Sequence, residues 1–428
     1  MERWTGILGI AVFIGVAWLL STNRSAVRWR LVAIGLALQV VLAWLLLTVD
    51  VAVWALDGVA RVVNGVISSA AAGSEFIFGG LADQAGPWGF IFAVQALPVI
   101  IFFGALMAVL YHLGVMQRIV VALAWCLRRT MGISGAEALS VAANIFVGQT
   151  EAPLVVRPYI AKFTQSQLAL LMTGGFATIA GSVLGAYVIM LGGGEESSRI
   201  LFAKHLMIAS VLSAPAAIVL AKLMVPETEA PVEDSLRIAE QERARNLFEA
   251  AAIGTTDGLR LALNVAAMLI AFLALLALIN WPLAELSEWR PIADWRAERS
   301  LAPFSVQMGL GILFTPLAAI MGVPWDECAR FGSLLGEKLF LTEFVAYGHL
   351  AELARSEEAP LSPRTVQIGA YALCGFANLP SIGIQIGGIA ALAPERRADL
   401  ASLGLRAMLA GAMASWCTAC VASLFIPA

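Results

Sequence analysis

The sequence predicts an all-α polytopic membrane protein with about eight transmembrane helices, two re-entrant hairpins in an inverted repeat, and two broken helices. Three observations support this class. Of the 428 residues, 60% are hydrophobic and only 13% are charged, whereas a typical soluble domain carries about 25% charged residues. Apolar segments long enough to cross a bilayer recur along the chain. Polar pairs interrupt two further apolar regions at matching places.

Eight segments qualify as spans, because a transmembrane helix needs about 20 predominantly apolar residues. The first segment has only Arg3 as a flanking positive charge and no small-x-small cleavage site after it, so we interpret it as a span and not as a signal peptide. The eight segments are residues 4–21, 31–49, 88–113, 166–193, 200–225, 259–281, 365–393 and 401–426.

Basic residues in the short loops predict the orientation of the spans, because cytoplasmic loops carry an excess of Lys and Arg. Placing three basic loops in the cytoplasm puts both termini outside, together with the acidic loop 192–198. The basic residues are Arg24, Arg28 and Arg30 after the first span, Arg118, Arg128 and Arg129 after the third, and Arg396 and Arg397 before the last.

Two apolar regions, 132–162 and 303–350, remain outside the spans, and each contains a Thr-Glu pair. Three motifs recur in order roughly 190 to 200 residues apart, which indicates an internal repeat. If both regions are re-entrant hairpins, the parity of the spans makes them enter from opposite faces, and such inverted copies are common in secondary transporters. The matched motifs are MGISGAEA (131–138) with MGVPWDECA (321–329), Thr150-Glu151 with Thr342-Glu343, and GGFATIAGS (174–182) with CGFANLPSIG (374–383).

Segment 304–323 is open to two interpretations. It could cross the membrane, which would reverse the orientation of everything after it and place Arg396 and Arg397 outside. The repeat pairs this segment with the basic interfacial stretch 115–131. We therefore favour an amphipathic helix on the outer face.

The long span of each repeat is interrupted at mid-membrane depth. GGFATIAGS contains three glycines and two hydroxyl residues, and CGFANLPSIG contains Gly375, Asn378, Pro380 and Ser381. Non-helical backbone at this depth is tolerated only where it lines a cavity or is buried in protein. The motifs therefore predict broken helices, whose ends can bind polar substrate groups and a cation. Close helix packing by small residues is the plainer alternative for the glycines.

Glu151 and Glu343 are functional candidates, because a charged residue at the bilayer centre costs on the order of 2.5 to 3.5 kcal/mol and usually faces a cavity or pathway. The structural alternative is an ion pair with Arg157 or Lys338. Glu137 is different: with Ser134 it has the spacing of a capping box at the start of the first hairpin.

Several segments closely resemble the signatures of the concentrative nucleoside transporter family. They are NIFVGQTEAPLVVRPYI (144–160), TGGFATIAGSVLGAY (173–187), GEKLFLTEFVAY (336–347) and ALCGFANLPSIGI (372–384), and LPVIIFFGALMAVLYHLG (97–114) resembles the family's third helix. The resemblance runs in order from about residue 75 to the end. It implies a sodium-coupled transporter of nucleosides, not an enzyme, in the cell inner (plasma) membrane. The implied partners are nucleosides and membrane lipid. Nucleic acid is not expected as a partner, because the charges are divided among the loops and gather in no basic face.

The resemblance also implies a homotrimer, in which each protomer has a scaffold and a mobile transport domain that moves like an elevator. Residues 1–114 would form scaffold helices, and 115–225 the first transport-domain repeat. Residues 226–300 would form a cytoplasmic linker and a scaffold helix, and 301–428 the second repeat.

Carried over motif by motif, the resemblance implies a two-part nucleoside site and one sodium site. An amide beside a carboxylate suits the donors and acceptors of a base edge, and a carboxylate accepts from ribose hydroxyls. The base half would be Gln149, Thr150 and Glu151, lined by Gly148 and Val183; the ribose half would be Glu343, Asn378 and Ser381, with Phe376 against sugar and base. Sodium, with no other cofactor, would bind the Asn144 side chain, the Val147 and Ile179 carbonyls and the Thr178 hydroxyl.

Two departures from the family pattern bear on the ribose half. Leu379 and Pro380 stand where the family usually has Phe-Ser, and Thr342 replaces an Asn. Pro380 lacks a backbone donor, so substrate preference can differ. A proton-coupled nucleoside transporter would share every substrate residue and stays the main alternative. An intramembrane enzyme is the remote one, since the sequence has no Ser/His or HExxH arrangement.

Overall fold

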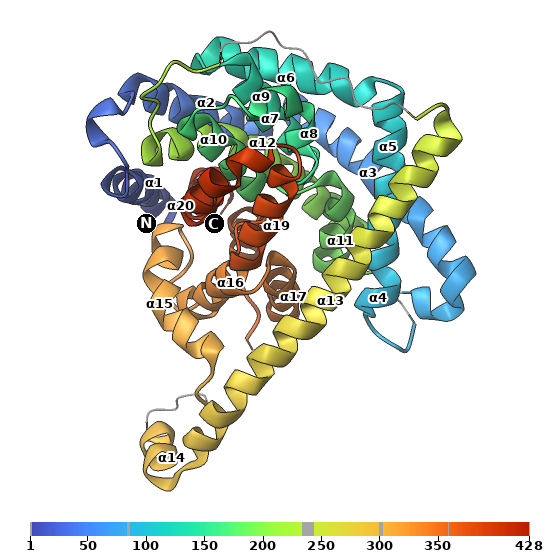
Figure 1. Cartoon of the computed structure of the whole chain (residues 1–428). Coiled ribbons are helices and arrows are strands. Elements are labelled where there is room, and N and C mark those ends of the chain that lie inside the picture. The colour runs from blue at the N-terminus through green and yellow to red at the C-terminus, as the bar shows by residue number, and fades with distance from the viewer. Residues whose placement is uncertain (1, 84–85, 233–243, 299–302, 358, 428) are drawn as a thin grey trace.

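The computed structural model describes residues 2–83, 86–232, 244–298, 303–357 and 359–427, and every regular element in these ranges is a helix (Figure 1). This confirms the all-α class. The linker predicted at the start of the range 226–300 falls partly on residues 233–243, which lie outside the described ranges. The helices are α1 (Glu2–Leu19), η1 (Arg24–Ala26), α2 (Trp29–Thr48), α3 (Asp50–Phe78), η2 (Gly79–Ala82), α4 (Phe92–Gln95), α5 (Leu97–His112), α6 (Val115–Met131), α7 (Gly135–Asn144), α8 (Ala152–Val155), α9 (Arg157–Ile160), α10 (Gln165–Ala177), α11 (Gly181–Gly192), α12 (Glu196–Met224), α13 (Leu247–Glu288), α14 (Arg290–Ala297), α15 (Val306–Ile320), α16 (Cys328–Phe340), α17 (Glu343–Ala354), α18 (Pro363–Ala372), α19 (Leu379–Ala390), η3 (Pro394–Arg396) and α20 (Arg397–Ser423).

Seven helical stretches of the described chain are long and apolar enough to cross a membrane by length and composition. Six of them correspond to predicted spans. The predicted spans 4–21 and 365–393 are not among the seven. The first corresponds to a shorter apolar helix over Trp4–Leu19, and the second is divided between α18 and α19. The seven are Trp29–Thr48, Asp50–Ala82, Phe92–His112, Gln165–Gly192, Glu196–Met224, Leu247–Glu288 and Pro394–Ser423.

The stretch Asp50–Ala82 was not predicted as a span, and its polar side chains explain why. Asp57 of α3 pairs with Lys204 of α12 at 2.8 Å, and the buried Asn64 amide donates to Glu196 at 3.3 Å. These polar residues face a neighbouring helix, so they lower the hydropathy of the segment without exposing charge to lipid. The sequence pattern cannot distinguish such a face from a water-facing one.

Both long spans of the repeats are broken at the predicted places. The helix α10 ends at Ala177 and α11 begins at Gly181, and Thr178 and Ala180 between them have extended backbone. The helix α18 ends at Ala372 and α19 begins only at Leu379. A backbone amide freed by the first break donates to hairpin 1, from Gly181 to the Phe146 carbonyl at 2.8 Å.

The two regions left outside the spans fold as helix–turn–helix segments. The first, which we call hairpin 1, runs from α7 through the turn at 145–151 to α8 and α9; the second, hairpin 2, consists of α16, Leu341, Thr342 and α17. Hairpin 1 begins with the predicted capping box, in which the Glu137 amide donates to Ser134 Oγ at 3.3 Å and the Ser134 amide to Glu137 Oε2 at 2.8 Å.

The open ends of the hairpins lie at opposite ends of α20. Near the start of α20, Arg396 donates to the Phe163 carbonyl at the end of hairpin 1 at 2.6 Å. At its other end, Arg364 of α18 donates to the Ser423 carbonyl at 3.0 Å, and the α18 cap residue Ser362 is bonded to Glu327 at the start of hairpin 2.

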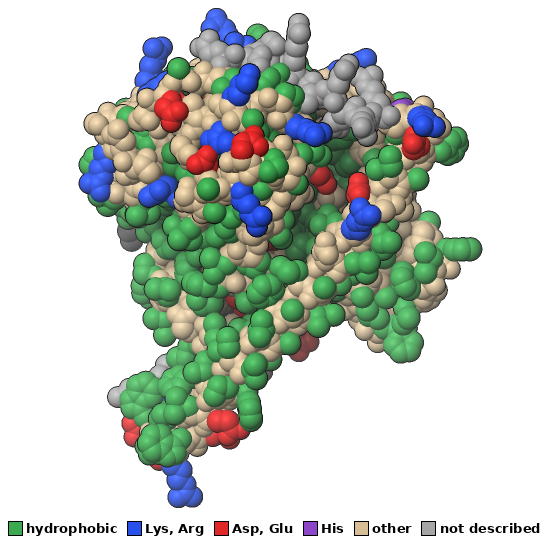
Figure 2. Space-filling view, viewed as in Figure 1, with side chains coloured by type: hydrophobic (Ala, Val, Ile, Leu, Met, Phe, Trp, Pro, Cys, Tyr) green, Lys and Arg blue, Asp and Glu red, His purple; other side chains and the backbone are tan. Residues whose placement is uncertain are grey.

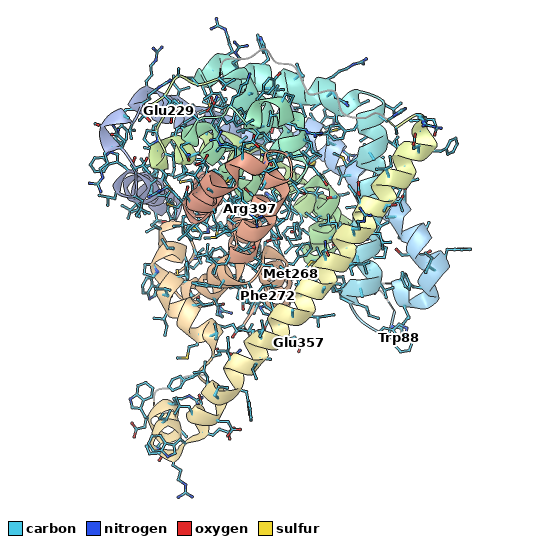
Figure 3. All side chains as sticks on the ribbon, viewed as in Figure 1. Trp88, Glu229, Met268, Phe272, Glu357 and Arg397 are labelled. Carbon is cyan, nitrogen blue, oxygen red and sulfur yellow. The ribbon has the colours of Figure 1, made fainter. Side chains whose placement is uncertain are left out.

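Basic loops gather at the hairpin 1 end. The Thr22 amide, in the loop after α1, donates to the Met224 carbonyl at 3.0 Å, and Lys222 pairs with Glu137 at 2.5 Å. Charged side chains collect over the upper part of the view in Figure 2, with mostly hydrophobic side chains below them. In Figure 3, Glu229 marks this end, and Glu357, just after hairpin 2, lies in the lower part of the view. Which end faces the cytoplasm stays a prediction.

The helix α13 crosses the front of the molecule in Figure 1 and packs on α5 through glycines. A methyl group on Gly254 would lie 2.5 Å from the Gly104 carbonyl oxygen, so the backbones approach as closely as small residues allow. The opposite side of α13 exposes large apolar side chains such as Ile270, Leu278 and Trp281.

The helix α15, in the segment with two interpretations, has 15 residues, which is short of the roughly 20 that a simple span needs. It packs closely along α16, since a methyl group on Gly311 would lie 2.6 Å from the Ala329 carbonyl oxygen. Its free side exposes Ile312 and Leu313. That face is apolar, so the polar outer face expected of an amphipathic helix is absent from this described segment.

Candidate functional site

The two broken helices touch each other at their Gly-Phe-Ala motifs. Gly375 has φ of +100°, and a methyl group there would lie 2.5 Å from the Phe176 carbonyl oxygen and 2.8 Å from that of Ala177. Glycine alone combines the left-handed backbone with this approach. The motif matched between the repeats is therefore the place where the two copies meet.

Replacing Gly375 by alanine is expected to lower the free energy of unfolding by about 2 kcal/mol or more, because it adds both a disfavoured φ and a backbone clash. Gly383→Ala in α19 is the matched control, since nothing lies within 4 Å of its added methyl group. Thermal unfolding of the purified protein in detergent measures both changes. Equal melting temperatures for the two variants would contradict the close crossing.

Hairpin 1 brings Gln149 against the second broken helix. Gln149 Nε2 donates to Ser381 Oγ at 3.3 Å, and Gln149 Oε1 accepts from Gln385 Nε2 at 3.0 Å. Gln385 also donates to the Met172 carbonyl at 3.1 Å. Sequence reasoning missed Gln385, although its position four residues after Ser381 on α19 places both on one helix face. Thr150 is exposed beside Gly388 of the same helix.

Glu343, the first residue of α17, is bonded on both carboxylate oxygens and is 2% exposed. Tyr187 Oη donates to Oε1 at 2.9 Å, and Asn378 Nδ2 donates to Oε2 at 2.8 Å. Tyr187 was not predicted to belong to the site, although it is the last residue of segment 173–187, which resembles a family signature. The glutamate of hairpin 2 is thus joined to both broken helices.

Pro380 leaves this arrangement intact. It is the second residue of α19, where a helix has no internal partner for the backbone amide. The next amide, that of Ser381, donates to Asn378 Oδ1 at 2.9 Å. Asn378 therefore caps α19 with its oxygen and contacts Glu343 with its nitrogen.

Among the described residues, neither Glu151 nor Glu343 forms the ion pair considered as the structural alternative. Lys338 is fully buried, and its Nζ donates to the Ala372 and Cys374 carbonyls, both at 2.9 Å, and to Ser415 Oγ at 2.6 Å. Arg157 is exposed. Glu151 Oε2 instead accepts from the Gly148 amide at 3.0 Å and closes the tip of hairpin 1.

The predicted cation ligands lie where hairpin 1 meets the first broken helix. Asn144 is 1% exposed, and its Nδ2 donates to the Ser140 carbonyl at 3.0 Å. Its Oδ1 is buried and has no hydrogen-bond partner in the described chain. Such an unpaired oxygen is costly unless a bound group satisfies it, and carbonyl and hydroxyl oxygens at a helix break suit Na⁺.

The other three predicted ligands are buried beside it. A methyl group on Gly174 would lie 3.0 Å from Asn144 Nδ2, and the Thr178 hydroxyl donates to the Gly174 carbonyl at 3.0 Å. Val147 and Ile179 are 5% and 1% exposed. The residues present therefore fit a sodium ion by their chemistry.

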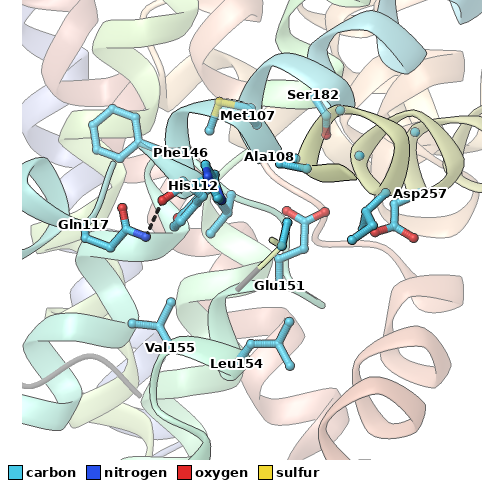
Figure 4. Close-up of a pocket in the computed structure, with 18 of the residues that line it drawn as sticks. Met107, Ala108, His112, Gln117, Phe146, Glu151, Leu154, Val155, Ser182 and Asp257 are labelled. Carbon is cyan, nitrogen blue, oxygen red and sulfur yellow. Dashed lines mark hydrogen bonds between the residues drawn. The ribbon is translucent and has the colours of Figure 1, made fainter. Parts of the chain in front are cut away.

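A cavity of about 490 Å³ lies next to this polar cluster (Figure 4). Val147, Glu151 and Ser182 line one side of it, and residues of α5, α6 and α13 line the other. The described residues that line it do not include Gln149, Glu343, Asn378 or Ser381. The cavity is therefore adjacent to the predicted nucleoside site and shares Glu151 with it.

Two hairpins and two broken helices that enclose buried polar groups define a membrane transporter of the kind that binds its substrate within the bilayer. Models of the Na⁺-dependent nucleoside transporter N-terminus and C-terminus match residues 8–81 and 205–423, and a nucleoside recognition model matches residues 93–194. The chain belongs to the concentrative nucleoside transporter family.

Known proteins align with this chain over its whole length. An uncharacterized transporter of Haemophilus influenzae is 45% identical over 100% of this chain and 98% of its own length. Sodium/nucleoside cotransporter 1 is 41% identical in mouse and 40% in human, and this chain spans 64% of the length of each. The solved structure of CNTnw in an inward-facing substrate-bound state is 41% identical, with a TM-score of 0.90 over 99% of both chains. CNTnw in an outward-facing state gives a TM-score of 0.89.

Proposed function

We propose that this protein imports nucleosides across the cell inner membrane as a sodium-coupled secondary transporter. The observation that carries the proposal is the pairing of each hairpin with α19 or its cap: Gln149 with Ser381, and Glu343 with Asn378. These four side chains offer amide, hydroxyl and carboxylate groups at one buried place. The relatives named as sodium/nucleoside cotransporters support the substrate class and the ion.

A nucleoside would enter by exchanging these internal hydrogen bonds for its own. Gln149, Thr150 and Glu151 offer donors and acceptors to the base, with Gly148 and Val183 beside them, and the carboxylate of Glu343 can accept from ribose hydroxyls. Phe376 would face sugar and base. A site built this way rejects an analogue that lacks a hydroxyl, because its own groups are then left unpaired.

The transport movement and the assembly are part of the proposal. The open ends of the two hairpins, at opposite ends of α20, support an inverted repeat and therefore alternating access. The repeats 115–225 and 301–428 would form the mobile domain of an elevator, and 1–114 with 226–300 its scaffold. The apolar free face of α13 suits lipid or a neighbouring protomer of a homotrimer.

Replacing sodium by choline at fixed pH tests both the function and the ion. Uptake of uridine or adenosine into proteoliposomes is expected to saturate with nucleoside and to collapse without sodium, because Asn144 and the residues around Thr178 would lose their bridging cation. Saturable uptake that persists in choline and follows a proton gradient would favour the proton-coupled alternative. The absence of saturable uptake of any nucleoside would contradict the function itself.

A further inference from the structure

We propose that the cavity between hairpin 1 and helices α5, α6 and α13 is a second, weaker nucleoside-binding site. It would receive the nucleoside as it leaves the hairpin tips. This inference rests on the proposed function and names a site that the family resemblance does not include. We call this cavity the vestibule; its volume of about 490 Å³ is within the range of roughly 300 to 1,000 Å³ typical of small-molecule sites.

Buried polar atoms that lack a partner occur on four of the residues that line the vestibule. They are Tyr111 Oη and His112 Nδ1 of α5, Gln117 Oε1 of α6, and Ser182 Oγ of α11, and none has a hydrogen-bond partner in the described chain. Four such atoms in one cavity are unusual, because buried polar groups are nearly always paired. Each such atom destabilises the protein unless a bound group satisfies it.

A neighbouring hydrogen bond fixes the orientation of the Gln117 amide. Gln117 Nε2 donates to the Tyr111 carbonyl at 2.6 Å, which holds the amide in place and leaves Oε1 free to accept (Figure 4). The hydroxyls of Tyr111 and Ser182 can each donate and accept. A ligand that offers both donors and acceptors would therefore be bound.

Two carboxylates add strong acceptors to the same cavity. Figure 4 shows Glu151 of hairpin 1 and Asp257 of α13 around one space. Within the described ranges, Glu151 accepts from the Gly148 amide. Asp257 lies 3.9 Å from Arg260, and the side chains of Asp257 and Arg260 are both largely exposed. Each carboxylate can accept hydrogen bonds from hydroxyl or amino groups, as a ribose or a base provides.

The remaining lining is apolar and suits a flat ring. Met107, Phe146 and Leu154 contribute it, from α5 and from hairpin 1. Apolar walls with a few convergent polar groups are the usual composition of a small-molecule site. A nucleoside has the matching division into ring faces and hydroxyl edges. A hydrated ion would leave the apolar walls unused, and a lipid chain would leave the polar atoms unpaired.

The position of Glu151 connects the two sites. Its carboxylate closes the hairpin 1 tip by accepting from Gly148, and it also faces the vestibule. A nucleoside that leaves Gln149 and Ser381 would thus keep one contact while it forms new ones with Tyr111 and Gln117. Such a stepwise exchange avoids leaving the substrate unpaired inside the membrane.

Equilibrium binding of radiolabelled uridine and adenosine to the full-length protein in detergent with sodium tests the vestibule. We expect two components in the unsubstituted protein. Glu343→Gln should remove the tight component and keep the weak one. The double variant Tyr111→Phe and Gln117→Leu should keep the tight component and weaken the other about tenfold, since it removes two hydrogen bonds to the ligand.

Uptake kinetics provide a second readout with a matched control. Ile253 and Leu259 are both about half exposed on α13, at 50% and 44%, but only Ile253 lines the vestibule. Ile253→Trp should fill the cavity and lower the maximal uptake rate severalfold while tight binding persists. Leu259→Trp should change neither, which also controls for effects of tryptophan on folding.

The outcomes separate the two proposals. A single binding component that Glu343→Gln abolishes, in a protein that transports nucleosides normally, overturns the vestibule and leaves the proposed function standing. Equal uptake rates for the two tryptophan variants also overturn it. A protein that neither binds nor transports any nucleoside refutes the proposed function, and the vestibule with it.

Discussion

Uptake of uridine or adenosine is expected to fall at least about 100-fold when Glu343 is replaced by glutamine. The carboxylate accepts from Tyr187 on one oxygen and from Asn378 on the other. A glutamine keeps the shape but turns its NH₂ group toward one of these donors. Glutamine turns one acceptor oxygen into a donor group and leaves the other oxygen uncharged. Hydrogen bonds to charged groups contribute about 1.5 to 3 kcal/mol each, and losing one while weakening the other corresponds to a decrease of about this size.

Glu352→Gln is the matched control, because Glu352 lies on the same helix but is exposed. Uptake into proteoliposomes at saturating sodium measures both variants, and size-exclusion chromatography checks that they have the same assembly. Normal uptake by Glu343→Gln would refute the role of Glu343 in the ribose half of the site.

The sodium concentration for half-maximal uptake is expected to rise at least about tenfold when Asn144 is replaced by leucine. The buried Asn144 Oδ1 has no partner in the described chain, and leucine removes this oxygen from the proposed cation site. A tenfold change corresponds to about 1.4 kcal/mol, which is a modest share of the cost of desolvating a cation with one ligand missing.

Asn144→Asp serves as the control, because it keeps an oxygen at the same position. Uptake is measured over a range of sodium concentrations, with choline added to keep the ionic strength constant. The aspartate variant should retain sodium dependence near that of the unsubstituted protein. A leucine variant with unchanged sodium dependence would place the coupling ion elsewhere.

The polar groups of the proposed nucleoside site form hydrogen bonds with one another. Gln149 is bonded to Ser381 and Gln385, and Glu343 to Asn378 and Tyr187. Each group would otherwise be buried unpaired at a cost of about 1 to 3 kcal/mol. If a nucleoside binds here as proposed, its affinity would depend on the difference between the hydrogen bonds it forms and those it replaces.

Most of the candidate site was predictable because polar residues are conspicuous in an apolar chain. Lipid cannot satisfy buried amides and carboxylates, so Gln149, Glu151, Glu343 and Asn378 had to serve some purpose. Gln385 and Tyr187 escaped prediction, because a single polar residue in an apolar helix is compatible with ordinary packing. Each also lies far from its partner along the sequence, so no local pattern indicates that the two are in contact.

The amphipathic helix α3 shows what a hydropathy profile cannot distinguish when membrane spans are predicted. Its segment was not predicted as a span, and its polar residues Asp57 and Asn64 both pair with α12. Hydropathy counts a polar side chain in the same way whether it faces water or another helix. The physical difference lies in the partner, which only the folded chain supplies.

By itself, the sequence determined the membrane class, the two broken helices, the two hairpin segments and the family, because these follow from local composition and from motifs within short stretches. Only the tertiary structure decided that Gly375 crosses the first broken helix, that Lys338 binds carbonyls and not a glutamate, and that unpaired atoms from three helices face one vestibule. The physical reason is that hydrogen bonding and close packing act between atoms a few ångströms apart in space. The residues concerned are separated by up to 200 positions in the chain, as Phe176 and Gly375 nearly are, and no local pattern records which of them will meet.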